Sequence, residues 1–121
     1  MPKLLIAGKP DFTSRIVGLL HPMRGKFTIT NPHPSAIAEI AVKMETEGHP
    51  FDAIIVFNRM CPTYGHLLPR TIKERGGCTP VIVVCELQDE RFFGYDCVML
   101  FSENLTSGTL RTGIERCARV T

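Results

Sequence analysis

Short apolar segments alternate with longer segments of helical periodicity along the chain. The apolar segments span residues 4–7, 27–30, 53–57, 81–85 and 97–101, and each has the length of a strand. The first, third and fourth are apolar at every position, which is typical of strands covered on both faces of a sheet. The pattern therefore predicts a sheet whose central strands are buried on both sides.

Between these strands, apolar residues recur every three or four positions, which indicates amphipathic helices. Asp11 is a candidate cap for the first helix, and Ser35 is a candidate cap for the second. Gly48 is expected to end the second helix, because glycine accepts the left-handed conformation that commonly follows a helix. The last helix is expected to begin near Thr106 or Ser107.

Strands that alternate with helices predict a parallel sheet with helices on both faces. Five strands within 121 residues favour a flavodoxin-like, doubly wound α/β fold with strand order 2-1-3-4-5. This length suits one domain, so we expect residues 1–121 to form a single unit. In such sheets, ligands and chemistry lie at the carboxyl ends of the strands, near the point where the strand order reverses.

Charge and hydropathy argue against several classes of function. The net charge of +2 is too small to indicate nucleic-acid or membrane binding. No apolar run approaches the roughly 20 residues that cross a bilayer, and the first residues lack the pattern of a signal peptide. We therefore expect a cytoplasmic protein with no direct contact to nucleic acid or membrane.

The cysteines and loops indicate no cofactor. Five cysteines are widely spaced without a C-x-x-C pair, and no histidine lies at zinc-ligand spacing from a cysteine pair. The segment GKPDFTS after the first strand lacks the spacing of a phosphate-binding loop, although Thr13 and Ser14 faintly resemble the loop that holds an FMN phosphate. We expect reduced thiols, no metal and no cofactor.

Several segments resemble the receiver domains of bacterial response regulators, in the CheY-like superfamily. GHLLPRTIKERGGCTPVIVVCE, residues 65–86, is similar to their third helix and fourth strand. LLIAGKPDFTSRIVGLL is similar to their first strand and helix, and FDAIIVFNRM to their third strand. The resemblance covers residues 3–86 and implies the same flavodoxin-like fold. The chain stops where a receiver stops, which fits the N-terminal module of a longer regulator.

The resemblance also implies which residues would carry phosphorylation. Receivers take a phosphoryl group from a histidine kinase onto an aspartate that ends the third strand, beside Mg²⁺ held by an acidic pair. Here the acidic pair falls on Ala7 and Gly8, the phosphoacceptor on Phe57, and a conserved hydroxyl position of the family on Cys85. Phosphoryl transfer needs a carboxylate nucleophile and oxygen ligands for a hard cation. We therefore expect no phosphorylation on aspartate and no enzymatic activity.

The lysine that contacts the phosphoryl group in receivers falls on Glu103, or nearer to Leu100 if the fifth strand is anchored on Asp96. Neither position holds a lysine. Asp52 opens the third strand, roughly 16 Å from its far end, so we expect it at the opposite edge of the sheet. The other polar residues expected at the carboxyl edge are Lys9, Asp11, Asn58, Arg59 and Glu86.

The segment between the fourth and fifth strands is shorter than in receivers and lacks a clear apolar stripe, so we expect a shortened or irregular fourth helix. Phe92, Phe93 and Tyr95 fall in this segment. They either fill the space that the helix leaves or form a partner-binding patch, since clustered aromatic residues favour interface cores. Receivers dimerise and signal through the face of the fourth helix, fifth strand and fifth helix, which implies a protein partner or homodimer there.

Together these observations favour a pseudo-receiver, an atypical receiver domain of two-component (phosphorelay) signal transduction that acts through protein–protein interaction. Phe57 is then expected to fill the former phosphorylation pocket. The alternative is a small flavodoxin-like domain that binds a nucleotide or another ligand at the carboxyl ends of the strands. A thiol enzyme centred on Cys85 is a third reading, disfavoured because no adjacent residue supplies a base.

Overall fold

The computed structural model describes residues 3–8, 10–21, 25–30, 34–57, 68–85, 97–100 and 105–120. The strands in these ranges are β1 (Lys3–Ala7), β2 (Lys26–Thr30), β3 (Ala53–Phe57), β4 (Val81–Cys85) and β5 (Cys97–Leu100). The helices are α1 (Pro10–Leu20), α2 (Pro34–Thr46), α3 (Leu68–Glu74) and α4 (Ser107–Val120). For Phe57, Cys85 and β5, the description is of the backbone alone.

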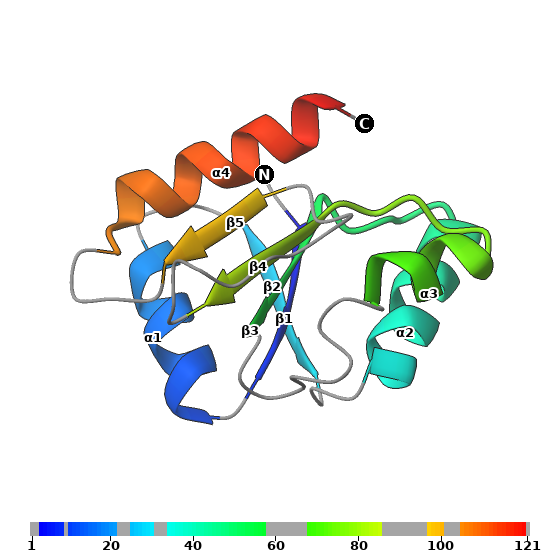
Figure 1. Cartoon of the computed structure of the whole chain (residues 1–121), viewed down its shortest axis with the longest axis horizontal. Coiled ribbons are helices and arrows are strands. Elements are labelled where there is room, and N and C mark those ends of the chain that lie inside the picture. Colours follow the sequence, from blue (N-terminus) through cyan, green and yellow to red (C-terminus); the bar gives the residue numbers. More distant parts are fainter. Residues whose placement is uncertain are drawn as a thin grey trace.

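The strands form one parallel sheet in the order β2-β1-β3-β4-β5, so the flavodoxin-like order predicted from the sequence is confirmed. α1 and α4 lie on one face of the sheet, and α2 and α3 lie on the other (Figure 1). α4 is the helix that the sequence predicts as the fifth. The predicted short fourth helix falls on residues 86–96, outside the described residues.

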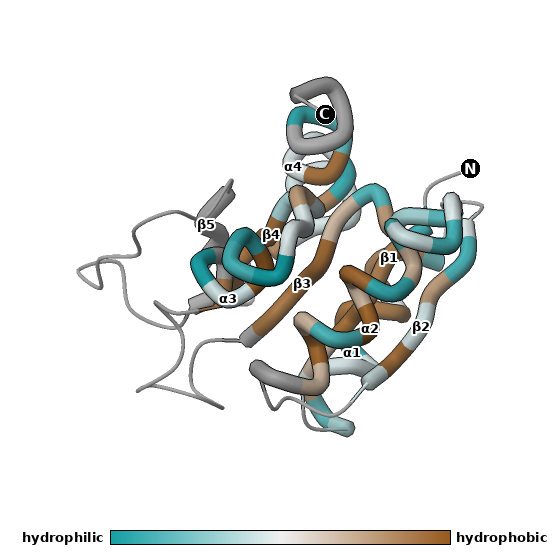
Figure 2. Tube along the Cα trace, turned by 90° about the vertical axis from the view of Figure 1, so that its right-hand side faces the viewer, coloured by the Kyte–Doolittle hydropathy of each residue, from teal (hydrophilic) through white to brown (hydrophobic). Residues whose placement is uncertain are grey.

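The side chains of β1 show how the sheet is buried. Leu4 and Ile6 belong to the apolar cluster under α1 and α4, whereas Leu5 and Ala7 belong to the cluster under α2 and α3. Because side chains alternate between the faces of a strand, both sets must be apolar when helices cover both faces. β3 and β4 follow the same rule, and Figure 2 shows β3 as hydrophobic along most of its length. The predicted burial of the three central strands is confirmed.

Two helices begin earlier than the sequence predicts. α1 begins at Pro10 and α2 begins at Pro34. Proline suits the first helical position, because its φ is already helical and its missing N–H would have no partner there. Asp11 and Ser35 therefore lie inside the first turn, and the prediction that they cap these helices was wrong. The Asp11 carboxylate still lies near the positive end of the helix dipole, where negative charge is favourable.

The end of α2 lies where the sequence predicts it. Gly48 has a φ of 84°, a left-handed conformation that costs glycine little. Its N–H donates to the Glu45 carbonyl at 3.1 Å, and the His49 N–H donates to the Met44 carbonyl at 2.9 Å. These two bonds satisfy carbonyls that the helix itself leaves unpaired.

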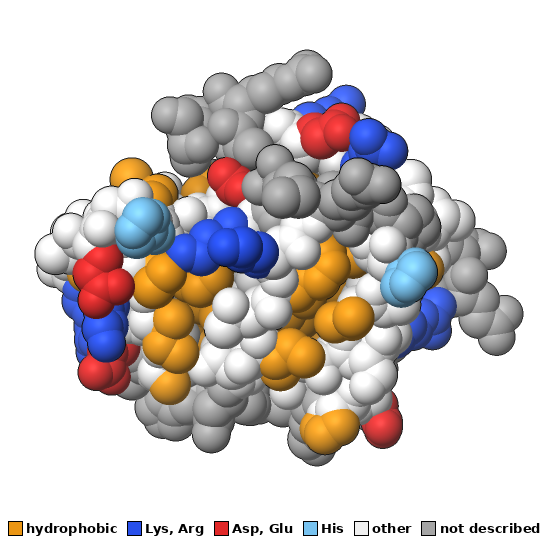
Figure 3. Space-filling view, turned by 180° about the vertical axis from the view of Figure 1, so that it is seen from behind, with side chains coloured by type: hydrophobic (Ala, Val, Ile, Leu, Met, Phe, Trp, Pro, Cys, Tyr) orange, Lys and Arg blue, Asp and Glu red, His pale blue; other side chains and the backbone are white. Residues whose placement is uncertain are grey.

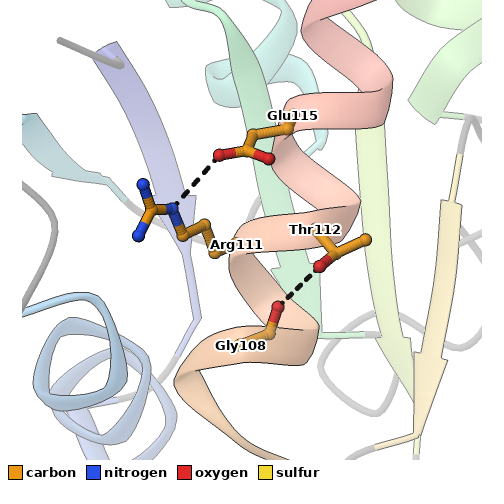
Figure 4. A network of polar contacts seen from close by, with 4 residues as sticks. All are labelled: Gly108, Arg111, Thr112 and Glu115. Carbon is orange, nitrogen blue, oxygen red and sulfur yellow. Dashed lines mark hydrogen bonds and ion pairs between the residues drawn. The ribbon is translucent and has the colours of Figure 1, made fainter.

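α4 begins at Ser107, as the sequence predicts, and Thr106 caps it. The Thr106 hydroxyl accepts a hydrogen bond from the Thr109 N–H at 3.2 Å. On the outer side of the helix, the Thr112 hydroxyl donates to the Gly108 carbonyl at 2.9 Å, in the network that Figure 4 shows. Within the described residues, no helix is long and apolar enough to cross a membrane.

A carboxylate on α2 fixes the start of β4. Glu45 accepts hydrogen bonds from the Cys78 N–H at 3.0 and 3.1 Å, and a further one from the Thr79 hydroxyl. Thr79 is only 7% exposed, so its hydroxyl has little access to water. Glu45 therefore satisfies the buried Thr79 hydroxyl and the exposed Cys78 N–H, at the point where the chain turns from α3 into the sheet.

We predict that Glu45→Ala lowers the free energy of unfolding by about 1–3 kcal/mol, because the Thr79 hydroxyl and the Cys78 N–H lose their partner. Glu47→Ala is the matched control, because Glu47 is exposed and should change stability by less than about 0.5 kcal/mol. Urea denaturation followed by circular dichroism measures both. Equal effects of the two substitutions would contradict this role of Glu45.

Candidate functional site

The carboxyl ends of the strands meet at one edge of the sheet, as the parallel order requires. Ala7 ends β1, Phe57 ends β3 and Cys85 ends β4, and the strand register aligns these ends with one another. Cys85 is paired with Leu100, the last residue of β5. The structure therefore brings Ala7, Gly8, Phe57 and Cys85 to one edge, where the sequence predicts the site.

The first position of the expected acidic pair is part of the core. Ala7 is 1% exposed and belongs to the apolar cluster under α2 and α3. A carboxylate here would be surrounded by apolar side chains, and burying an unpaired charge is strongly unfavourable. Position 7 therefore fits a small apolar residue and not a metal ligand.

The second position is closed by an aromatic ring. A Cβ atom placed on Gly8 would lie 2.5 Å from Cδ1 of Phe12 and 3.3 Å from two further ring atoms. Phe12 is 3% exposed and packs in the cluster under α1 and α4. Real Cβ atoms essentially never approach another atom to 2.5 Å. The ring thus occupies the space that any side chain at position 8 would need.

Phe12 is the functional position that the sequence analysis missed. The sequence feature that could have indicated it is an aromatic residue four positions after a glycine, on the first turn of the helix that follows β1. That spacing alone does not show contact, because Gly8 lies outside the helix. The contact depends on how the chain turns from β1 into α1, which only the structure shows.

The hydroxyl of Thr13 beside this edge already has a partner. Thr13 is 4% exposed, and its Oγ1 donates to the Pro10 carbonyl at 3.2 Å. Threonine side chains in helices commonly make such hydrogen bonds to a backbone carbonyl of the preceding turn. The faint resemblance of Thr13 to an FMN-phosphate loop therefore gains no support from its hydrogen bonding.

Asp11 is exposed in the first turn of α1. In the part of the chain that the structure describes, no three His, Cys, Asp or Glu residues lie close enough together to hold a metal ion. Asp11 therefore lies near the carboxyl edge, and among the described residues it is not part of a group that could hold a metal ion.

Asp52 lies at the opposite, amino edge, as predicted. Its Oδ2 accepts a hydrogen bond from the Lys3 backbone N–H at 2.7 Å, and its own N–H donates to the Lys3 carbonyl at 2.7 Å. The Lys3 ammonium donates to the His49 carbonyl at 2.7 Å and lies 5.0 Å from the centre of the Phe51 ring. These contacts join the first and third strands at their starts, so Asp52 has a structural role.

The remaining predicted site residues lie outside the described residues, or have only their backbone described. The first group comprises Lys9, Asn58, Arg59, Glu86, Phe92, Phe93, Tyr95 and Glu103. The side chains of Phe57 and Cys85 form the second group. That Phe57 fills the former pocket, and that the three aromatic residues form a patch or fill space, stay predictions.

Comparison with known proteins identifies the fold. No protein-family model matches the chain, and no curated protein sequence matches it. Among solved structures, the N-terminal domain of a response regulator/sensory box/GGDEF protein from Carboxydothermus hydrogenoformans aligns over 98% of this chain and 94% of its own, with 16% identity and a TM-score of 0.66. A pilus assembly-related protein from Burkholderia pseudomallei aligns over 98% and 90%, with 14% identity and a TM-score of 0.78.

A further match comes from the structure of the histidine kinase ThkA in complex with the response regulator protein TrrA. It covers 97% of this chain and 98% of the matched chain, with 14% identity and a TM-score of 0.71. The receiver domain of the response regulator TorR is also similar, with 16% identity and a TM-score of 0.69 over 95% of this chain and 94% of its own. The chain therefore has the fold of response-regulator receiver domains, as the sequence resemblance predicts.

We predict that Gly8→Asp lowers the free energy of unfolding by about 1–3 kcal/mol, because the new side chain meets the Phe12 ring. Gly108→Asp is the matched control. There the nearest atom to an added Cβ is 3.8 Å away, and an acidic residue in the first turn of a helix is favourable. Urea denaturation that shows the same stability for both variants would overturn the steric argument.

Proposed function

We propose that the chain is a pseudo-receiver, a domain with the receiver fold that is not phosphorylated on aspartate and signals through protein–protein contacts. In this proposal the domain has no enzymatic activity and needs no metal or cofactor. It belongs to a two-component or phosphorelay pathway in the cytoplasm and contacts neither nucleic acid nor membrane directly. Residues 1–121 form one domain, which fits the N-terminal module of a longer regulator.

The contact between Gly8 and Phe12 carries the proposal. Acyl-phosphate formation in this fold needs Mg²⁺ to neutralise the charge that develops on the phosphoryl oxygens. Magnesium binds oxygen ligands in near-octahedral geometry. Ala7 offers no side-chain oxygen, and the space beside Gly8 is filled by an aromatic ring. A carboxylate side chain at position 8 would therefore require the Phe12 ring to move.

Loss of the phosphorylation chemistry changes how a signal enters the domain. In a phosphorylated receiver, the phosphoryl group shifts the population between two conformations. A ligand shifts such an equilibrium only through its different affinity for the two states. In this domain we infer that a bound protein supplies that difference in affinity, so that the abundance of the partner replaces phosphate as the input.

The proposed contact face comprises β5, α4 and residues 86–96, which include Phe92, Phe93 and Tyr95. α4 turns Leu110 and Ile114 into the core and leaves a polar side outward. On that side Arg111 and Glu115 form an exposed ion pair at 3.1 Å (Figure 4), which adds little stability and leaves both side chains accessible at the surface. We propose a protein partner or a homodimer at this face.

We predict that titration with Mg²⁺ and beryllofluoride, a phosphoryl mimic, produces no saturable amide shifts at residues 7, 8 and 57 in NMR spectra. A phosphorylatable receiver domain titrated in parallel is the control, and it should show saturable shifts at its phosphorylation site. Saturable shifts at the carboxyl edge of this chain would overturn the proposal. Shifts there with FMN or ATP, but not with beryllofluoride, would instead favour the flavodoxin-like alternative.

A further inference from the structure

β2 is an edge strand with an unusually apolar exposed position. It pairs with β1 and with no other described strand. Lys26, Thr28 and Ile29 are exposed, and Ile29 retains 57% of its surface, the one large hydrophobic side chain so exposed among the described residues. Figure 3 views the molecule from the side of β2, opposite to β5, and shows hydrophobic side chains reaching the surface in its middle.

Such an edge presents a row of backbone N–H and C=O groups that can pair with another strand. Proteins commonly block their edges with proline, a bulge or several charges. β2 has the sequence KFTIT, with one charge and no proline, and its pairing with β1 is continuous over all five residues. The described strand therefore carries little that would prevent pairing.

The sequence of β2 complements itself in the antiparallel direction. When Thr28 lies on a two-fold axis, Thr28 faces Thr28 of a second copy, Phe27 faces Ile29, and Lys26 faces Thr30. Along β2, the backbone N–H and C=O groups of successive residues point alternately toward β1 and away from it. In this register the numbers of paired residues differ by an even number, so residues whose backbone groups point away from β1 are paired with each other and can form hydrogen bonds. This register uses all five residues of the strand.

The side chains also fit this register. Phe27 and Ile29 are paired with Leu4 and Ile6 of β1, which belong to the cluster under α1 and α4. Residues paired across parallel strands share a face, so Phe27 and Ile29 lie on that same face. In this register, Phe27 of each copy lies beside Ile29 of the other copy, and a pair of an aromatic and a β-branched side chain across two strands is stabilising. It also covers Ile29.

Charge is compatible with the pairing. Lys26 is the only charged residue of β2, and in this register it faces a threonine. The two Lys26 residues lie at opposite ends of the paired strands, whereas like charges directly opposite each other would be unfavourable. The central pair of threonines is a favourable one.

We propose that a second copy of this chain binds at β2, in antiparallel register centred on Thr28, and joins the two sheets into one. The interface lies at the sheet edge opposite β5, so it leaves the β5 and α4 face open to a protein partner. The inference is independent of the proposed loss of phosphorylation, because it does not depend on Ala7, Gly8, Phe57 or Cys85.

Sedimentation equilibrium of the intact chain tests the proposal through a pair of matched substitutions. Wild type is expected at twice the monomer mass of 13.5 kDa. Thr28→Lys places two ammonium groups face to face on the axis and should weaken the dimer at least about tenfold. Thr46→Lys makes the same chemical change at the exposed end of α2, outside both proposed contact faces, and should leave the dimer intact. Thr112→Lys, on the exposed side of α4, tests the other face.

Two results of this experiment would overturn the proposal. One is a monomer mass for wild type at every concentration up to about 1 mM. The other is a dimer that Thr112→Lys dissociates and Thr28→Lys does not, which would place the interface at α4. Circular dichroism of each variant separates loss of folding from loss of association.

Cysteine cross-linking checks the register directly. Thr28→Cys places two thiols opposite each other, at the roughly 4.5–5.5 Å Cα separation of antiparallel pairs, which a disulfide can span. Lys26→Cys is the matched control, because its two thiols would lie at opposite ends of the paired strands. Under mild oxidation, the first variant should form a covalent dimer above the wild-type background and the second should not. Equal cross-linking of both variants would overturn the register.

Discussion

The burial of β1, β3 and β4 on both faces is the constraint on which the rest of this structure depends. Since side chains alternate along a strand, two covered faces require apolar residues at successive positions, and polar groups are confined to the strand ends. At the amino edge, Asp52 and Lys3 follow this rule through direct hydrogen bonds. At the carboxyl edge, apolar packing instead includes Ala7 in the cluster under α2 and α3, and Phe12, which contacts Gly8, in the cluster under α1 and α4.

The apolar packing at Ala7 and Gly8 is the reason for proposing a pseudo-receiver. In the receiver fold, the carboxyl edge is the place where a cation, a carboxylate and a phosphoryl group would meet. Here two of the required positions are filled by packing, and packing is not readily exchanged for charge, because interiors are as dense as organic crystals. At this edge Ala7 and Gly8 contribute packing and no side-chain oxygen for a cation. The packing at Ala7 and Gly8 is the observation that supports the proposed pseudo-receiver role.

Much of the fold was predictable because its determinants are local. Continuous apolar runs mark β1, β3 and β4, and Gly48 marks the end of α2 through its left-handed backbone. The predicted caps were wrong by two residues, since proline takes the first helical position and Asp11 and Ser35 lie one residue inside each helix. Contacts made by turns and by distant segments were not predictable. Examples are Phe12 against Gly8 and Glu45 with Cys78, whose partners meet only in the folded chain.

A double-mutant cycle between Gly8→Ala and Phe12→Ala tests the central claim most directly, because it measures whether the two positions share one space. If they do, Gly8→Ala is destabilising in the wild-type background and costs little once the ring is removed, with a coupling of about 1–3 kcal/mol in the free energy of unfolding. Additive effects, within about 0.5 kcal/mol, would show that the ring does not close position 8 and would contradict the account.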